Sequence, residues 1–141
     1  MIRKANKNDI KSINELGILL NSNFVNTYNI ENYINNPNYI ILVNEIEFIT
    51  GLLIIYNNID YYELEIIVVD EKCRKKGIAS NMIDYFLSNY DSKDIILEVD
   101  VNNNSAIRLY EKFGFSVIST RKKYYNGNDA YVMKRVVKWK I

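Results

Sequence analysis

Between residues 39 and 90 the apolar pattern changes from strand to helical spacing, and this change limits the folds that the chain can adopt. Up to residue 69, apolar runs rich in β-branched residues alternate with short polar segments, which predicts a meander of antiparallel strands. After Gly77, apolar residues recur at helical spacing over about 14 residues. The meander is expected at residues 39–43, about 46–56 and 61–69, with Asn44-Glu45 as its first tight connection.

Further elements are expected on both sides of this region. A helix should begin at Asp9, with an apolar face that extends to Leu19 and Leu20. Asn104 is the expected N-cap of a later helix, which Gly114 ends. The remaining expected elements are a short helix at about 29–35, a helix at 104–113, and strands at 2–5, 94–101, about 115–124 and 128–137, the last two joined by a hairpin at Asn126-Gly127.

This order of elements predicts an α/β or α+β domain with three layers. We expect a central mixed, mostly antiparallel sheet of about seven strands, flanked by about four helices. The length of 141 residues suits a single domain over residues 1–141. No apolar run approaches the ~20 residues of a membrane helix, and residues 1–10 do not resemble a signal peptide.

The composition excludes several kinds of chemistry. The chain has no histidine, which excludes histidine-based catalytic triads and histidine metal sites. Its one cysteine, Cys73, cannot form an intramolecular disulfide or a thiolate metal cluster, so we expect no metal and a cytoplasmic location. The net charge of +1 gives no overall field that would attract nucleic acid or a membrane. Any attraction for anions must therefore be local.

Positive charge is concentrated where a strand is followed by a helix, in the segment "VVDEKCRKKGIAS" at residues 68–80. The N-terminus of a helix carries unpaired N–H groups and a partial positive charge, so it attracts anions. Arg74, Gly77 and Ala79 form the pattern R-x-x-G-x-A, in which the glycine lets the backbone approach a ligand closely. We interpret this turn as a site for a phosphate or a diphosphate, with a solvated loop as the alternative.

Together with a second motif, this turn resembles the GNAT N-acetyltransferase superfamily. The second motif, N-x-x-A-x-x-x-Y-x-x-x-G-F, runs from Asn103 to Phe115, and the resemblance covers about residues 46–135. It implies that the diphosphate of acetyl-CoA binds to the backbone of residues 75–80, and that the thiol end lies beside the second motif. The cofactor-binding residues that it implies are Ile67, Val68, Val69, Arg74, Lys75, Lys76, Gly77, Ile78, Ala79, Ser80 and Asn103.

The second half is most similar to the RimI-type ribosomal-protein-alanine N-acetyltransferases. The segments "LEVDVNN", "AIRLYEKFGF" and "RKKYYNGNDAYVMKR" follow one another as they do in that subfamily. The resemblance implies that the acceptor is a protein N-terminal tail, such as that of a ribosomal protein. The sequence departs from the subfamily pattern in three places, and these departures bear on the predicted acceptor. Asn128 stands where the subfamily usually has Glu, Asp100 stands where it often has Arg, and residues 21–36 lack its Pro-Trp pair.

Two residues have chemistry that suits acetyl transfer to an amine. Glu98 lies in the apolar run "IILEV" at the position of the subfamily's base, and a carboxylate there could take a proton from the amine through water. Tyr110 occupies the motif position of the acid that protonates the leaving thiolate. The resemblance also implies that backbone N–H groups of residues 67–69 hold the acetyl carbonyl. The alternatives are an outward-facing strand residue for Glu98 and a core tyrosine for Tyr110.

Two other functions fit the same sequence. A GNAT enzyme could acetylate a small amine, such as a polyamine or an aminoglycoside, and the site would then carry an acidic cluster to hold a polycation. The sequence suggests no such cluster among Glu31, Glu45, Glu47 and Glu63. An acyl-CoA-binding module or a toxin-like partner protein is the second possibility. The pair Tyr124-Tyr125 could line an acceptor groove or pack within the hairpin.

Overall fold

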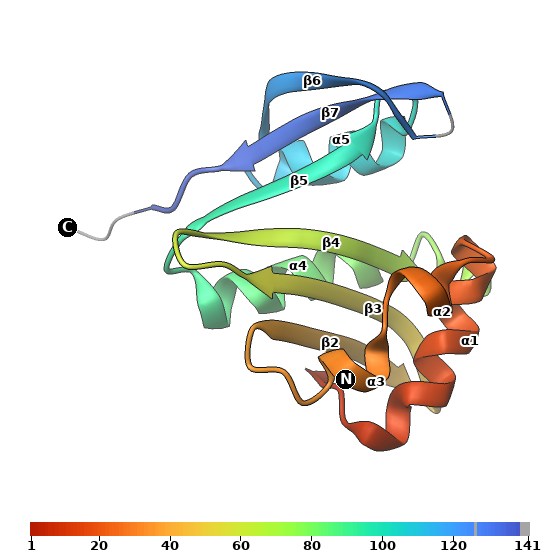
Figure 1. Cartoon of the computed structure of the whole chain (residues 1–141). Helices are drawn as coiled ribbons and strands as arrows, with labels where there is room; N and C mark the ends of the chain where they lie inside the picture. Colours follow the sequence, from red (N-terminus) through yellow and green to blue (C-terminus); the bar gives the residue numbers. More distant parts are fainter. Residues whose placement is uncertain (126, 139–141) are drawn as a thin grey trace.

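The computed structural model describes residues 1–125 and 127–138, with the backbone alone for residues 123–125. In this part of the chain, seven strands form one sheet in the order β1-β2-β3-β4-β5-β7-β6 (Figure 1). β4 and β5 pair in parallel, and the other neighbours pair antiparallel, which confirms the predicted mixed sheet. The strands are β1 (Ile2–Lys4), β2 (Tyr39–Ile46), β3 (Phe48–Asn57), β4 (Tyr61–Val69), β5 (Asp94–Asp100), β6 (Ser116–Tyr125) and β7 (Asn128–Arg135).

Helices cover both faces of the sheet. The N-terminal helices lie on one face of the β2–β4 half, and α4 lies behind β3 and β4 in the view of Figure 1. None of the helices in the described ranges is both long enough and apolar enough to cross a membrane. The helices are α1 (Ile10–Leu20), α2 (Phe24–Thr27), α3 (Ile30–Tyr33), α4 (Ile78–Tyr90) and α5 (Asn104–Lys112), with 3-10 turns at Lys7–Asp9 and Glu71–Cys73.

The central strands have a core on each face. Ile13 of α1 and Phe24 of α2 are fully buried against one face, together with alternate residues of β2 and β3. Met82 and Phe86 of α4 are buried against the other face. Strands that are buried on both sides need apolar residues at successive positions, which explains the continuous apolar runs of β2 and β3.

The N-terminal helices differ from the prediction in two respects. Leu19 is 74% exposed and Leu20 is 52% exposed, so neither belongs to the buried face of α1. Gly17 belongs to that face instead, because a Cβ at this position would lie 2.3 Å from the ring of Phe24. This close approach packs α2 against α1, and the sequence analysis did not predict α2.

The predicted connection between β2 and β3 is wrong by two residues. Asn44 and Glu45 lie within β2, and Ile46 pairs with Phe48 across the turn. Glu47 between them adopts a left-handed conformation with a φ of 65°. Such a φ is uncommon for glutamate, so the residue types in this turn did not reveal its position.

In the α5 region, the predicted N-cap and the predicted last helical residue each lie one position too late. Asn103, rather than Asn104, is the N-cap, because its Oδ1 accepts a hydrogen bond from the N–H of Ala106 at 3.3 Å. Gly114 has a φ of 91° and follows the end of the helix, as expected. Gly127 has a φ of 81° in the β6–β7 hairpin, which agrees with the Asn-Gly signal there.

Candidate active site

A β-bulge in β4 changes which face of the sheet its side chains reach. Ile55 of β3 pairs with Leu64, and Ile54 pairs with Ile66, so Glu65 is the extra residue. Leu64 is buried in the core beneath α4, whereas Ile66 is buried in the core beneath α1. The bulge therefore reverses the alternation of the strand and leaves Glu65 on the face opposite to α4.

β4 and β5 diverge beyond the bulge (Figure 1). Their parallel register ends at the pair of Leu64 and Leu97, although β4 continues to Val69 and remains paired with β3. In the described part of the chain, residues 65–69 thus have no strand partner on their β5 side. We call the diverging segments, residues 65–69 and 98–100, the wedge. Its unpaired backbone groups could bind an extended ligand as a further strand would be bound.

The three residues expected to hold the acetyl carbonyl lie along this open edge. Ile67 and Val69 pack against the core beneath α4, and Val68 is buried in the core beneath α1. Packing therefore occupies all three side chains. Their backbone is the part that could contact a ligand, as the sequence analysis expected.

The turn between β4 and α4 has the geometry of an anion-binding loop. Gly77 is the N-cap of α4, with a φ of 77°, and no side chain caps the first turn. Lys75 also has a positive φ, of 65°, which is uncommon for lysine and which nothing in the sequence predicted. Arg74, Lys75 and Lys76 are exposed beside this helix end. The first N–H groups of α4, at residues 78–80, therefore point into a region of positive charge.

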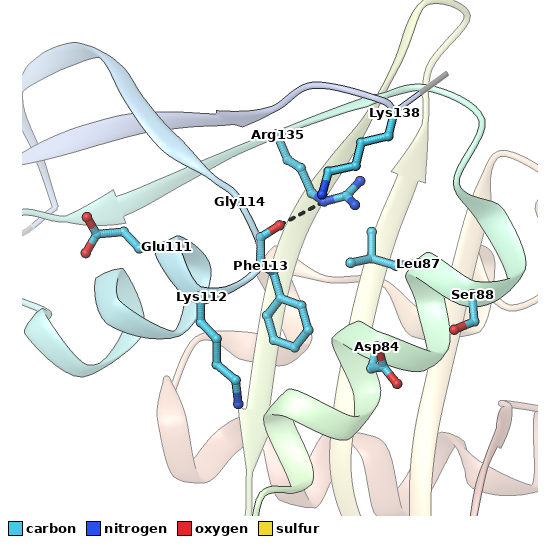
Figure 2. Close-up of a pocket in the computed structure, with 9 residues that line it drawn as sticks. All are labelled: Asp84, Leu87, Ser88, Glu111, Lys112, Phe113, Gly114, Arg135 and Lys138. Atoms are coloured by element: carbon cyan, nitrogen blue, oxygen red, sulfur yellow. Dashed lines mark hydrogen bonds between the residues drawn. The ribbon is translucent and has the colours of Figure 1, made fainter. Parts of the chain in front are cut away.

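A further cation reaches this helix end from α5. The Nζ atom of Lys112 lies 3.5 Å from the Oγ atom of Ser80 in the first turn of α4. Figure 2 shows the Lys112 side chain extending along α4, away from the end where Arg135 and Lys138 lie. The sequence analysis missed Lys112 because it belongs to a different helix, 32 positions from Ser80.

Glu98 and Tyr110 lie on opposite faces of the sheet. Leu97 and Val99 are buried in the core beneath α4, so Glu98 between them points to the other face. Tyr110 is 6% exposed and packs in the α4-side core, where its ring centroid lies 5.7 Å from that of Phe115. The structure thus places one carboxylate and one phenol on the two sides of the diverging strands.

The Glu98 carboxylate is held by a cation from β6. Its Oε1 atom lies 3.1 Å from the Nη1 atom of Arg121, and the Glu98 side chain is 19% exposed. Arg121 belongs to the segment "RKKYY" that resembles the RimI-type enzymes. This ion pair orients the carboxylate at the end of the β4–β5 register. The side chains of Tyr124 and Tyr125 from the same segment lie outside the described residues.

A pocket of about 260 Å³ opens on the Glu98 side of the sheet. The sequence analysis expected no acidic cluster among Glu31, Glu45, Glu47 and Glu63, and of these four only Glu63 lines the pocket. Glu63 and Glu65 reach the pocket from β4, where positions two apart share a face, and Glu98 reaches it from β5. In the described ranges, no set of three or more acidic or cysteine side chains is placed to hold a metal ion. The pocket is lined by Thr27, Tyr28, Tyr33, Glu63, Leu64, Glu65 and Glu98.

Glu65 has an unusual affinity for its proton. Burial raises the pKa of Glu65 to about 7, and the negative charge of Glu63 contributes to this rise. The pKa of the neighbouring Tyr39 is also raised, mainly by burial, with contributions from a hydrogen bond to Tyr33 and from the charge of Glu65. No salt bridge to Glu65 is formed within the described residues. The pocket therefore contains a carboxyl group that titrates near neutral pH.

Glu65→Gln should make the protein more stable at alkaline pH. Because the folded protein binds the Glu65 proton more tightly than the unfolded chain, wild-type stability falls as the pH rises from about 4.5 to about 7. Glutamine removes this loss, so we expect a gain of about 1 kcal/mol in the free energy of unfolding at pH 8, after allowance for the partial exposure of Glu65. Urea denaturation at pH 5 and pH 8 measures the difference.

The gain should be small at pH 5, where Glu65 is protonated in the folded protein. Glu31→Gln, at an exposed position on α3, is the matched control and should show no such dependence on pH. A gain from Glu65→Gln of equal size at both pH values would contradict the titration of Glu65 in the folded protein.

Comparison with known protein families identifies the family of this chain. Residues 10–137 match the family described as an acetyltransferase (GNAT) domain. The chain belongs to the GNAT acetyltransferase family. The resemblance based on the R-x-x-G-x-A turn and the Asn103–Phe115 motif is therefore confirmed, and so is the fold that it implied.

The relatives include several N-alpha-acetyltransferases. This GNAT chain is 42% identical over 74 residues to an N-alpha-acetyltransferase of Saccharolobus solfataricus, a match that covers 49% of this chain and 44% of the relative. It is 35% identical over 75 residues to human N-alpha-acetyltransferase 30, covering 50% of this chain and 21% of the relative. The matched region thus spans less than half the length of either curated relative.

Solved structures share the fold over nearly the whole chain. The ribosomal-protein-S18-alanine N-acetyltransferase of Escherichia coli has a TM-score of 0.81 at 19% identity, and the match covers 100% of this chain and 96% of that one. Ard1 of Thermoplasma volcanium has a TM-score of 0.83 at 24% identity, with coverages of 99% and 98%. At these identities the two structures support the GNAT fold of this chain and nothing more specific.

Proposed function

We propose that this GNAT chain transfers the acetyl group of acetyl-CoA to the N-terminal α-amine of a protein. The observation that carries the proposal is the placement of Glu98 and Tyr110 on opposite faces of the diverging strands. An amine that approaches from the Glu98 side and a thioester on the α4 side would meet in the wedge. Direct attack then uses separate groups for the two proton transfers, with Glu98 as the base through water and Tyr110 as the acid.

The α4 side of the wedge suits acetyl-CoA, which GNAT acetyltransferases use. We place its diphosphate on the N–H groups of residues 75–80, where Arg74 and the lysines, including Lys112, supply positive charge. The open backbone edge at residues 67–69 would donate hydrogen bonds to the acetyl carbonyl and stabilise its developing negative charge. Asn103 uses its Oδ1 atom as the N-cap of α5, which leaves its NH₂ group for a contact with the cofactor.

The choice of an α-amine rests on proton affinity and on the relatives. An α-amine has a pKa near ~8, against ~10.4 for lysine, so it loses its proton far more easily at neutral pH. The relatives named above are N-alpha-acetyltransferases, and the Escherichia coli enzyme of similar fold is named for the alanine of ribosomal protein S18. A ribosomal-protein N-terminus is the narrower form of the proposal. At Asp100 and Asn128 the sequence departs from the RimI-type pattern, so these two positions concern whether the acceptor is a ribosomal protein.

One observation favours a second candidate, acetylation of a small polyamine or aminoglycoside. The pocket on the Glu98 side contains three carboxyl groups, and such a group of acids can hold a polycation. The tyrosines in its wall, Tyr28 and Tyr33, suit the side chain of a peptide residue equally well. Charge alone therefore does not decide between the two acceptors.

Transfer of radiolabelled acetyl groups tests these functions together. The acceptors are peptides that differ in their first residue, the same peptides with a blocked N-terminus and an internal lysine, spermidine, and an aminoglycoside. We expect label on free α-amines, and none on the blocked peptides or small amines. Label on spermidine alone would establish the second candidate. Binding of acetyl-CoA without transfer to any acceptor would instead indicate an acyl-CoA-binding module.

A further inference from the structure

Acetylation of a protein N-terminus requires the nitrogen to lose two protons. The amine arrives largely as an ammonium ion at neutral pH and must lose one proton before it can attack the thioester carbonyl. Once the N–C bond forms, the nitrogen is positively charged again and must lose a second proton. One base and one acid, Glu98 and Tyr110, do not account for both losses.

We propose that Glu65 is the base that takes the first proton from the incoming ammonium ion, and that Glu98 takes the second proton through water. This inference rests on the proposed function and adds a catalytic residue to it. Glu65 and Glu98 line the same pocket from the two strands that diverge, so an amine in this pocket can contact both carboxylates. Glu65 is the bulge residue, and its side chain lines this pocket on the face opposite to α4.

The surroundings of the two carboxylates differ in a way that suits these roles. Glu98 is paired with Arg121 at 3.1 Å, and its side chain is 19% exposed where it lines the pocket. No cation pairs with Glu65 among the side chains that the structure describes, and the acceptor's own ammonium group would supply a positive charge beside it. The charged and titratable groups that face Glu65 are Tyr28, Tyr33, Tyr39, Glu63 and Glu98, with Arg121 behind Glu98.

The proton affinity of Glu65 agrees with the role that its position suggests. Its pKa of about 7 is close to that of an α-ammonium group, near ~8, so proton transfer between them costs only about 1 kcal/mol. A carboxylate with an ordinary pKa would make the same transfer several kcal/mol uphill. A base with a pKa near the working pH is also the most effective one.

Glu65, Glu98 and Tyr110 together account for every proton that moves in the reaction. The ammonium ion gives its first proton to Glu65, which releases it to solvent. The neutral amine then forms the N–C bond, the C–S bond breaks, and Tyr110 gives its phenol proton to the leaving thiolate. The second proton of the nitrogen passes through water to Glu98 and returns to Tyr110. The net products are the acetylated amine, CoA as the free thiol and one proton in solution.

The pH dependence of three variants tests the division of roles. The kcat/KM for an acceptor peptide is measured from pH 6 to 10 at saturating acetyl-CoA. Glu65→Gln should be at least about tenfold slower than wild type at pH 7, and should approach wild type above about pH 9, where the peptide arrives as a neutral amine. Glu98→Gln should be slower at every pH, because a neutral amine does not remove the need for the second transfer.

Glu63→Gln is the matched control on the same strand and in the same pocket. It removes a negative charge that raises the pKa of Glu65, so the rise of the wild-type profile near pH 7 should move to lower pH. A Glu65→Gln activity that is a constant fraction of wild type at every pH overturns the inference. Recovery of Glu98→Gln, but not Glu65→Gln, at high pH overturns it as well. A wild-type protein that acetylates no peptide would instead refute the proposed function, before any variant is compared.

Discussion

Tyr110→Phe should lower kcat for peptide acetylation by about 10²–10⁴-fold, the usual contribution of a general acid. Tyr110 is 6% exposed and packs beside Phe115, so the phenylalanine ring should fill the same space and leave the fold intact. The affinity for CoA should change little, because the variant loses a proton donor and keeps the packing. Steady-state kinetics and calorimetry with CoA measure the two quantities separately.

Tyr85→Phe is the control for this prediction. Tyr85 also packs at the edge of the α4-side core, but it is not among the proposed catalytic or binding residues. Its hydroxyl should be dispensable for kcat. A loss smaller than about threefold for Tyr110→Phe would leave Tyr110 as a core residue. If an acetyl-CoA analogue with a more acidic thiol restores the kcat of Tyr110→Phe, Tyr110 is supported as the donor to the thiolate, since a better leaving group needs less protonation.

Local signals were sufficient to predict most of the fold. The apolar runs of β2 and β3, the Asn-Gly hairpin and the helical spacing after Gly77 each depend on residues close together in the sequence. The failures concern tertiary contacts. Phe24 of α2 packs against Gly17 of α1, a contact between two helices. Glu47, in the turn between β2 and β3, has a left-handed conformation that glutamate rarely adopts.

The candidate site also has features that the local sequence predicts and features that depend on tertiary contacts. The anion-binding turn was predictable because Arg74, Gly77 and the helix start lie within a few positions of one another. The acidic pocket was not, because it brings Glu63 and Glu65 of β4 together with Glu98 of β5. The bulge at Glu65 was not predictable either, since nothing in "YYELEIIVV" indicates an extra residue. The approach of Lys112 to Ser80 and of Arg121 to Glu98 likewise joins elements that only the folded chain brings together.

Gly77→Asp should weaken CoA binding by about 100-fold or more. A Cβ atom at this position would meet no atom within 4 Å, so the protein can accept the side chain without a clash. The φ of 77° is a conformation that Asp and Asn adopt more readily than most residues, so the variant should still fold. The new carboxylate would lie at the helix end that we assign to the diphosphate, where it repels two negative charges. Calorimetry with CoA measures the loss.

Gly77→Asn separates charge from shape, because Asn and Asp have nearly the same size and the same tolerance for a positive φ. Repulsion between unit charges at 4 Å is worth about 1 kcal/mol in water and more near a protein surface, so the two phosphate charges should make Asp at least about 30-fold worse than Asn. This difference should shrink as the salt concentration rises, since screening weakens interactions between exposed charges. Equal affinities of the Asp and Asn variants at low salt would place the diphosphate elsewhere. The basic turn at residues 72–76 would then be an ordinary solvated loop.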